Sequence, residues 1–315
     1  MLEDALNALA PRLGGPVSGL RRLSGGASQE TWAFKAGERD LILRRKPAGV
    51  VGTGAAIGLV KEAALIRAAA EQGAPVPAVV HVCRPEDGLG EAYVMARVEG
   101  ETLGRRIVRD EAFAAVRPAL ARRCGEVLAR IHATPVDGLP DLPLSDAASE
   151  IAKYEAVYRA VGARRPIFEA AFRWLKDRAP PLETPVLVHG DFRNGNLMIH
   201  PRQGLAAVLD WELAHLGDPA EDLGWICVNS WRFGGARPVG GFGDYQDLLA
   251  GYGRAVALER VLYWQTLGSL KWGVMCLMMY AAYASGADPS VERAMIGRRT
   301  SETEIDLIAL LERAA

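Results

Sequence analysis

The sequence predicts an α+β fold of two lobes, in which a small lobe built on a sheet precedes a larger, mainly helical lobe. Strand-like segments separated by turn signals fill much of the first hundred residues. Beyond Gly100, long stretches carry apolar residues at three- and four-residue spacing, which is the period of a helix packed on one face. Strand-like segments return only briefly inside the helical part, and the residues between them are the ones that suggest chemistry.

The first lobe is expected to begin with a helix and to continue as a meander of three antiparallel strands. The helix is predicted over residues 1–13. The extended segments are predicted at 17–24, 28–35 and 40–45. The turn signals SGGA at 24–27 and AGERD at 36–40 separate these segments, so neighbouring strands can pair directly.

A helix and two further strands complete this lobe. The helix is predicted over 56–72 and ends at Gly73, because the prolines in APVPAV at 74–79 cannot continue it. The last two strand-like segments of the lobe are at 78–83 and 91–98.

The second lobe is expected to be mainly helical, so we predict that residues 1–100 and 101–315 form separate lobes. Helices are predicted at 110–133, 146–161, 166–178, from about 219, 243–256, 258–285 and 290–313. Short strands are predicted at 185–189, 197–199 and 206–210.

The composition excludes several classes of protein. Of 315 residues, 37 are Lys or Arg and 38 are Asp or Glu, so no excess positive charge would attract nucleic acid or an anionic membrane. The four cysteines are widely spaced without a CxxC pair, which indicates neither a zinc site nor a disulfide framework. Buried thiols in a reducing cytosol are expected, and the acidic start of the sequence does not resemble a secretory signal. A cytoplasmic protein is therefore predicted.

One apolar stretch, residues 261–284, could suggest a membrane span. Gln265, Lys271 and several small polar residues interrupt it, so it falls short of the ~20 mainly apolar residues that a span requires. We predict a buried core helix there and no contact with a membrane.

The motif HGDFRNGN at 189–196, followed by LDWE at 209–212, predicts a phosphoryl-transfer site. Such a site needs a carboxylate beside the acceptor hydroxyl and hard oxygen ligands for Mg²⁺ on the nucleotide phosphates. We assign Asp191 as the catalytic base, and Asn196 and Asp210 as the metal ligands. A tight turn at HGD and a helix cap at Asp210 would explain either piece alone, but the complete spacing favours the catalytic interpretation.

Several blocks of the sequence, in order, resemble the aminoglycoside phosphotransferase family, whose kinase-like fold is shared with choline kinases. The blocks are LSGGASQETW at 23–32, APVP at 74–77, YVMARVEG at 93–100 and VHGDF at 188–192. LDWE, together with LGDPAEDLGW at 216–225, is similar more narrowly to kinase-like domains fused to acyl-CoA dehydrogenases. The resemblance covers most of the chain and implies a bilobal protein-kinase-like fold that binds ATP and Mg²⁺.

Carried over to these positions, the resemblance implies the residues that bind the nucleotide. The loop over the phosphates would be Ser24, Gly25, Gly26, Ala27 and Ser28, whose small side chains allow backbone amides to approach phosphate. Arg44 would reach the phosphates where protein kinases have a lysine, with Lys46 as an alternative, and Glu62 would be its acidic partner. Arginine is a planar fork and lysine a point charge, so Arg44 departs from the family pattern.

The resemblance also implies a hinge at about 95–100, where backbone groups near Ala96 and Val98 would bind adenine. His189 is expected to pack and to form hydrogen bonds rather than to transfer protons, because Asp191 already supplies a base. Asp218 and Asp222 are expected to brace the loop or to cap the next helix.

We therefore predict an ATP- and Mg²⁺-dependent phosphotransferase that acts on a hydroxyl group of a small molecule. The segment 229–247 mixes aromatic residues, glycines and arginines such as Arg232 and Arg237, whereas a polycationic aminoglycoside would call for carboxylates. A hydroxyacyl-type metabolite is favoured, with aminoglycoside O-phosphorylation as the alternative. A pseudokinase or nucleotide-sensing scaffold is the alternative of another class. Protein kinase activity is disfavoured because HGD replaces HRD. The sequence leaves the acceptor, the choice of ATP or GTP and the oligomeric state open.

Overall fold

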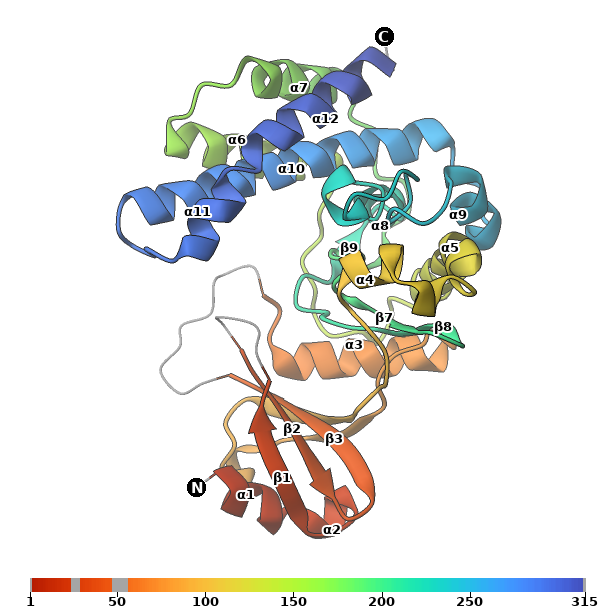
Figure 1. The fold of residues 1–315 in the computed structure, drawn as a ribbon, viewed down its shortest axis with the longest axis vertical. Coiled ribbons are helices and arrows are strands. Elements are labelled where there is room, and N and C mark those ends of the chain that lie inside the picture. Colours follow the sequence, from red (N-terminus) through yellow and green to blue (C-terminus); the bar gives the residue numbers. More distant parts are fainter. Residues whose placement is uncertain (1, 24–28, 47–55, 314–315) are drawn as a thin grey trace.

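A five-stranded antiparallel sheet occupies one end of the molecule in the computed structural model, which describes residues 2–23, 29–46 and 56–313 (Figure 1). Its strands, in the order β1-β2-β3-β5-β4, are β1 (Val17–Arg22), β2 (Glu30–Ala36), β3 (Arg39–Arg45), β5 (Ala92–Ala96) and β4 (Val79–Val82). The predicted meander is present as β1, β2 and β3. Strand β5 pairs with β3, so Tyr93 lies opposite Arg44.

Three helices accompany this sheet. The helix predicted over 1–13 is two short helices, α1 (Leu2–Ala8) and α2 (Ala10–Leu13), since Pro11 in the first turn of α2 lacks the N–H that a continuous helix requires. Helix α3 (Leu59–Glu71) is followed by Gly73, whose φ of 75° suits the end of a helix.

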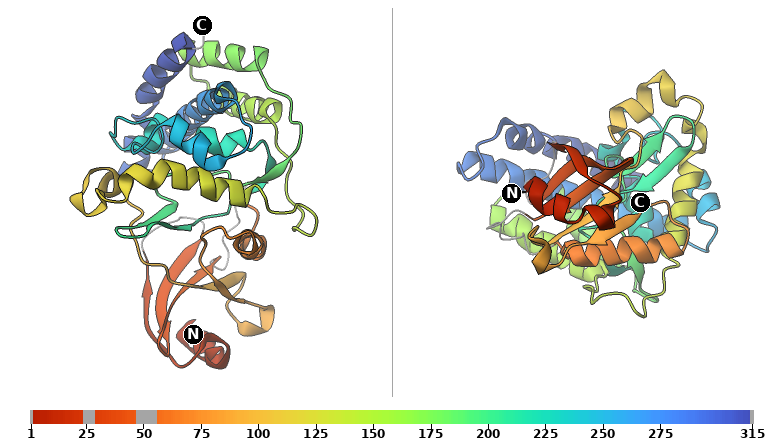
Figure 2. Two further views of the ribbon diagram at one scale, coloured as in Figure 1. Left: turned by 90° about the vertical axis from the view of Figure 1, so that its right-hand side faces the viewer. Right: turned by 90° about the horizontal axis from the view of Figure 1, so that it is seen from below.

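The rest of the chain is mainly helical, as predicted. Its helices are α4 (Gly104–Arg109), α5 (Leu120–Ile131), α6 (Ala147–Val161), α7 (Pro166–Asp177), α8 (Ala220–Trp225), α9 (Tyr245–Tyr252), α10 (Leu258–Ala284), α11 (Val291–Gly297) and α12 (Thr300–Arg313). Short 3₁₀ turns span Pro85–Asp87, Glu111–Phe113, Arg117–Ala119 and Asn229–Arg232. The left panel of Figure 2 shows the sheet and these helices at opposite ends of the molecule.

Two predicted helices were too long. The helix expected over 110–133 starts only at Leu120, because Pro118 lies in a separate 3₁₀ turn just before it. The helix expected over 290–313 is broken after Gly297, where the Thr300 hydroxyl donates a hydrogen bond to the Gly297 carbonyl over 2.8 Å. A side chain at Gly297 would collide with Tyr280, so this glycine lets α11 pack closely on α10.

Two small sheets position the central motifs. Strand β6 (Val186–Val188) pairs with β9 (His215–Gly217), and β7 (Leu197–His200) pairs with β8 (Gly204–Val208), both antiparallel. The sequence did not predict β9, because this three-residue strand is identified only by its pairing with a strand that is distant in the sequence. HGDFRNGN therefore joins β6 to β7, and LDWE directly follows β8.

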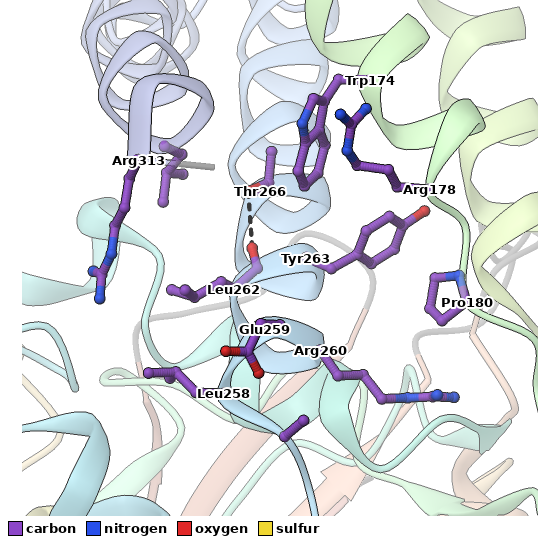
Figure 3. A pocket seen from close by; sticks show the side chains of 12 residues that line it. Trp174, Arg178, Pro180, Leu258, Glu259, Arg260, Leu262, Tyr263, Thr266 and Arg313 are labelled. Atoms are coloured by element: carbon purple, nitrogen blue, oxygen red, sulfur yellow. Dashed lines mark hydrogen bonds between the residues drawn. The ribbon is translucent and has the colours of Figure 1, made fainter. Parts of the chain in front are cut away.

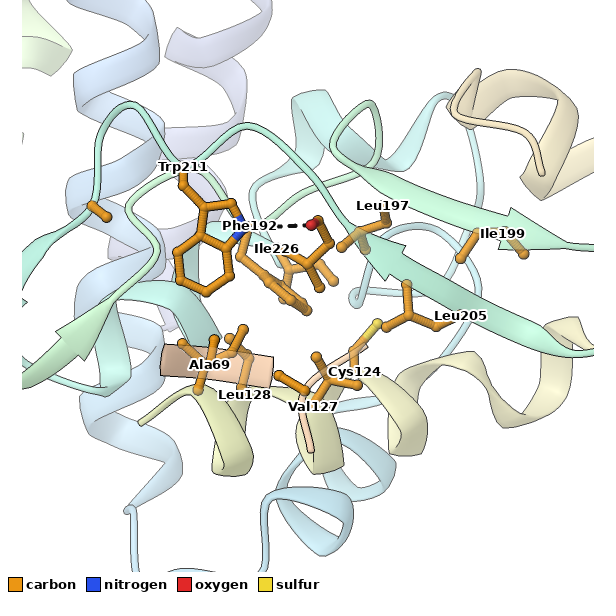
Figure 4. Packing of buried hydrophobic residues seen from close by; sticks show 14 of the residues in the cluster. Ala69, Cys124, Val127, Leu128, Phe192, Leu197, Ile199, Leu205, Trp211 and Ile226 are labelled. Carbon is orange, nitrogen blue, oxygen red and sulfur yellow. Dashed lines mark hydrogen bonds between the residues drawn. The ribbon is translucent and has the colours of Figure 1, made fainter. Parts of the chain in front are cut away.

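One hydrophobic core runs from α3 to the helical part (Figure 4). Ala69 on α3 meets Leu128 on α5, and both lie near the buried Phe192 and Trp211 of the two motifs. A second core joins α6, α7, α10 and α12. Within the described residues, no helix combines the length and hydrophobicity needed to cross a membrane. Helix α10 lies in the second core, where its residues Tyr263, Trp264 and Leu267 are buried.

Candidate active site

The loop that carries Asp191 is held at its base by a buried carboxylate. Oδ2 of Asp222 accepts the backbone N–H of His189 over 2.8 Å, and Oδ1 accepts that of Gly190 over 3.0 Å. Nε2 of His132 lies 3.1 Å from Oδ2, and its Nδ1 lies 3.0 Å from the hydroxyl of Tyr252. Burial opposes ionisation of Asp222, but these hydrogen bonds outweigh it and hold its pKa below the usual value.

The turn at Gly190 requires glycine. Its φ is 79°, and a Cβ there would lie 2.5 Å from the carbonyl oxygen of Leu213. The preceding His189 is fully buried, with Nε2 placed 3.1 Å from the Leu209 carbonyl, and burial lowers its pKa. His189 is thus a buried residue that packs and forms a hydrogen bond, as the sequence predicts.

Three donors surround the carboxylate of Asp191. Its Oδ1 accepts hydrogen bonds from Nε1 of Trp225 over 2.7 Å and from Nε of Arg193 over 2.8 Å. Its Oδ2 accepts one from Nδ2 of Asn196 over 2.7 Å. The carboxylate is therefore held from both sides, while its side chain keeps 15% of its surface exposed.

Asn196 and Asp210 can offer oxygen atoms to a metal ion. Nδ2 of Asn196 donates to both the carboxylate and the carbonyl of Asp191, which leaves its Oδ1 for another ligand. The Asn196 carbonyl accepts the N–H of Leu209 over 2.8 Å, so the two motifs lie side by side. Asp210 has a φ of 65°, an unusual conformation for a non-glycine residue that is often found at functional sites.

Arg44 lies between two carboxylates. Its Nη2 is 2.9 Å from Oδ1 of Asp210 and 3.7 Å from Oε2 of Glu62, which is fully buried on α3. Tyr93 lies opposite Arg44 in the sheet, and its hydroxyl donates to Glu62 over 3.4 Å. Burial opposes the charge of Arg44, but Tyr93 and the two carboxylates raise its pKa, so it remains a cation.

Two residues that the sequence did not single out join this cluster. Gln29 accepts hydrogen bonds from Arg44 and donates to Glu62 over 3.0 Å and to Glu212 over 3.2 Å. Burial, followed by the charges of Asp210 and Glu62, raises the pKa of Glu212 to about 7. LDWE could have suggested Glu212 by its nearness to Asp210, whereas no local signal marks Gln29.

The other predicted nucleotide contacts stay predictions. Ser24, Gly25, Gly26, Ala27 and Ser28 lie outside the described residues. The backbone N–H of Ala96 donates to the Ala78 carbonyl over 2.9 Å, and the contact of adenine with other backbone groups near Ala96 stays a prediction. The partly buried Val98 follows the end of β5 and keeps its predicted role as a proposal.

The arginines predicted to meet the acceptor have protein partners. Arg232 donates two hydrogen bonds to the Cys227 carbonyl, and Arg237 pairs with Asp244. Arg193 instead lies beside the base, with its guanidinium carbon 4.4 Å from the ring centre of Trp231. The cationic and aromatic groups next to Asp191 are thus Arg193, Trp231 and Trp225.

A cavity of about 770 Å³ opens elsewhere, between α7, α10 and α12 (Figure 3). Trp174, Tyr263 and Arg178 line it, whereas Asp191, Asn196 and Asp210 do not. Its size alone does not make it the active site, because the groups suited to phosphoryl transfer converge around Asp191.

Comparisons with known proteins agree with this geometry. A family model described as "Phosphotransferase enzyme family" matches residues 19–280. Mouse acyl-CoA dehydrogenase family member 10 is 31% identical over 231 residues, which cover 68% of this chain but only 20% of that relative. The chain thus spans about a fifth of the length of this curated relative.

Solved structures share the fold over nearly the whole chain. A predicted aminoglycoside phosphotransferase from Ralstonia eutropha superimposes with a TM-score of 0.79 at 22% identity, covering 98% of both chains. A spectinomycin phosphotransferase solved with ADP and spectinomycin gives a TM-score of 0.63 at 14% identity, also covering 98% of both chains. At these identities the likeness shows the kinase-like fold.

Proposed function

The chain belongs to the phosphotransferase enzyme family, and from that premise we propose that it transfers the γ-phosphoryl group of ATP to a hydroxyl group of a small molecule. The observation that carries the proposal is the convergence of Asp191, Asn196 and Asp210, with Arg44 paired to the last. These residues come from both motifs and from the sheet, and together they supply the base, the oxygen ligands and the cation that phosphoryl transfer uses.

Asp191 acts as the base in this proposal. It orients the acceptor hydroxyl and takes its proton as the acceptor oxygen forms a bond to the γ-phosphorus and the bond from phosphorus to the β-bridging oxygen breaks. Because Oδ1 already accepts two hydrogen bonds, Oδ2 is the oxygen with room for this proton. ADP then leaves with the bridging oxygen.

The residues present fit a magnesium ion. The amide oxygen of Asn196 takes no part in the hydrogen bonds that its Nδ2 donates, so it can bind the ion. Asp210 adds a carboxylate whose side chain is 35% exposed. These are the hard oxygen donors that Mg²⁺ prefers, and Mg²⁺ would neutralise charge on the phosphates when bound. Arg44 would contribute a second positive charge from β3.

The nucleotide is proposed to lie between the two lobes, whose boundary we put at about residue 100, between β5 and α4. Ser24 to Ser28 would cover the phosphates, and backbone groups near Ala96 and Val98 would contact adenine. Glu62 would hold Arg44 in place through their ion pair. It would not touch the nucleotide, because its side chain is fully buried.

For the acceptor, we propose an amphipathic or anionic hydroxylated metabolite of hydroxyacyl type. Arg193 and the indole rings of Trp225 and Trp231 adjoin the base, which suits a partly apolar molecule better than a polycation. The relation to an acyl-CoA dehydrogenase family member supports an acyl group in the acceptor. Aminoglycoside phosphorylation remains the alternative acceptor chemistry.

Magnesium-dependent ADP release by the purified protein tests the proposal across hydroxyacyl-CoAs, aminoglycosides, choline and sugars. Turnover with one class that falls by about a hundredfold or more in Asp191→Ala is expected. Turnover unchanged in Asp191→Ala would overturn the role of the base. MgATP binding without turnover by any acceptor would instead favour the nucleotide-sensing scaffold.

A further inference from the structure

The two donors on Oδ1 of Asp191 differ in kind. Arg193 is a flexible cation with a side chain that is 26% exposed, and it lies where an incoming phosphate can compete for it. Trp225 is neutral and 6% exposed, and its Nε1 donates to the same oxygen over 2.7 Å from the last residue of α8. A buried indole N–H cannot be drawn away by phosphate charge.

The indole of Trp225 is itself held by its neighbours. A Cβ on Gly268 would lie 2.9 Å from Cε3 of Trp225, so α10 approaches the ring without an intervening side chain. The ammonium of Lys271 lies 5.2 Å from the Trp225 ring, and the Trp231 ring centre is also 5.2 Å away. Packing on these sides therefore restricts the movement of the N–H donor.

We propose that Trp225 is a positioning residue for Asp191: its indole N–H fixes the rotation of the carboxylate so that Oδ2 faces the acceptor oxygen throughout the reaction. This proposal rests on the proposed function, in which Asp191 is the base. A carboxylate rotates readily about its terminal torsion. Once Arg193 turns to phosphate, Asn196 on Oδ2 would be the other remaining donor, so Trp225 supplies the second fixed donor, on Oδ1. In this role Trp225 acts through Asp191 and does not contact the nucleotide.

Trp225→Phe tests the inference because it removes the N–H and keeps an aromatic ring. Trp272→Phe is the matched control: Trp272 belongs to the same aromatic cluster and is 8% exposed, but its Nε1 has no hydrogen-bond partner among the residues that the structure describes. MgATP hydrolysis with water as the acceptor is the probe, since it requires no knowledge of the natural acceptor.

We expect Trp225→Phe to lower kcat on the order of ten- to a hundredfold, with KM for MgATP essentially unchanged, because the lost contact orients the base and not the nucleotide. Trp272→Phe should keep kcat close to that of the parent. Equal kcat values for the two variants would overturn the inference. If Trp225 contributed only to folding, Trp225→Phe would lower the melting temperature without lowering kcat at an unchanged KM.

Gly268→Ala provides a second route that leaves every tryptophan in place. The added methyl group must displace the Trp225 ring or the Val228 side chain, and a fall in kcat at unchanged KM is expected. This variant gives the answer if Trp225→Phe does not fold, and an unchanged kcat with a displaced indole would refute the inference. Asp191→Ala separates the two ideas: if it retains hydrolysis, the proposed function fails, whereas if it is inactive and Trp225→Phe is normal, only the positioning role fails.

Discussion

Nη2 of Arg44 lies 2.9 Å from Oδ1 of Asp210, so an ion pair joins strand β3 to the residue that begins the turn after β8. The same guanidinium lies 3.7 Å from the fully buried Glu62. Arginine at this position can pair with two carboxylates at once, because its planar guanidinium offers several N–H donors. The compact ammonium group of lysine cannot match this geometry. The departure from the family pattern is thus accommodated by the surrounding residues.

Arg44→Met should strongly destabilise the protein, because it leaves Glu62 buried without its cation. Breaking a buried ion pair in this way costs about 3–5 kcal/mol of unfolding free energy. Urea denaturation checks this, with Arg45→Ala as the control on the same strand. Arg45 pairs with Glu30 nearer the surface, and its loss should cost about 1 kcal/mol or less. Equal stability of the two variants would contradict the importance of the buried pair.

His215 should make stability depend on pH. Burial alone would lower its pKa, but Glu221, whose Oε2 lies 3.0 Å from Nε2, and the Leu213 carbonyl raise it to about 9. Lys271 and Glu150 also face this pair. Because the folded pKa lies above the ordinary value of 6.5, the stabilisation is complete below pH 6.5 and is lost as pH rises through about 9.

The difference in the His215 pKa corresponds to about 3 kcal/mol at most. Chemical denaturation from pH 6 to 10 should therefore show a falling unfolding free energy in the parent and a flatter profile in His215→Gln. His200→Gln, on strand β7 and outside this network, should keep the parental profile. A parental slope in His215→Gln would assign the pH dependence to other groups.

Asp210→Asn should raise the magnesium requirement. The amide keeps the shape and one oxygen of the side chain but removes the negative charge that attracts a divalent cation. We expect the Mg²⁺ concentration for half-maximal ADP release to rise by about tenfold or more, with a corresponding loss of affinity in calorimetric titrations. Asp177→Asn, at the exposed end of α7, serves as the control. Unchanged magnesium dependence in Asp210→Asn would remove Asp210 from the metal site.

The sequence could predict those parts of the site whose residues are neighbours along the chain. Asp191 and Asn196 share one loop, and Asp210 closely follows the next strand pair, so their spacing alone indicates their association. Trp225 and Gln29 could not be assigned from local patterns, because Trp225 on α8 and Gln29 just before β2 reach the site only through tertiary packing.

The same distinction explains the fold predictions. The sheet and most helix positions follow from local periodicity and turns, whereas β9 depends on a partner far away in the sequence. In the hinge, only the fold shows that the Ala78 carbonyl accepts the N–H of Ala96. The hydrogen-bond partners of a hinge depend on which strand lies next to it, and the sequence of the hinge alone does not specify that strand.

Asp222→Ala should destabilise the catalytic loop and abolish activity together. The variant leaves the backbone N–H groups of His189 and Gly190 without their buried acceptor, and each unsatisfied group costs about 1–3 kcal/mol. Asp222→Asn keeps one acceptor oxygen and should lose less. Thermal unfolding and ADP release would be measured for both variants. Full activity in Asp222→Ala would show that the loop holds its shape without this brace.

Helices α5 and α9 approach so closely that a single methyl group should separate them. A Cβ on Gly125 would lie 2.0 Å from the Leu248 carbonyl oxygen and 2.5 Å from the backbone nitrogen of Tyr252. Alanine favours a helix over glycine by about 1 kcal/mol, but the rigid backbone of α9 cannot yield without moving as a whole. Gly125→Ala should therefore lose about 2–4 kcal/mol of unfolding free energy.

Displacement of α9 should also reach the active site, because the Tyr252 hydroxyl lies 3.0 Å from His132, and His132 contacts the carboxylate that holds the catalytic loop. We therefore expect Gly125→Ala to reduce ADP release even at temperatures where it remains folded. Arg122→Ala, an exposed change on the same helix, should alter stability by about 0.5 kcal/mol or less and keep activity. A stable Gly125→Ala variant would mean that the two helices can move apart freely, and a destabilised one with full activity would mean that the brace does not transmit the displacement.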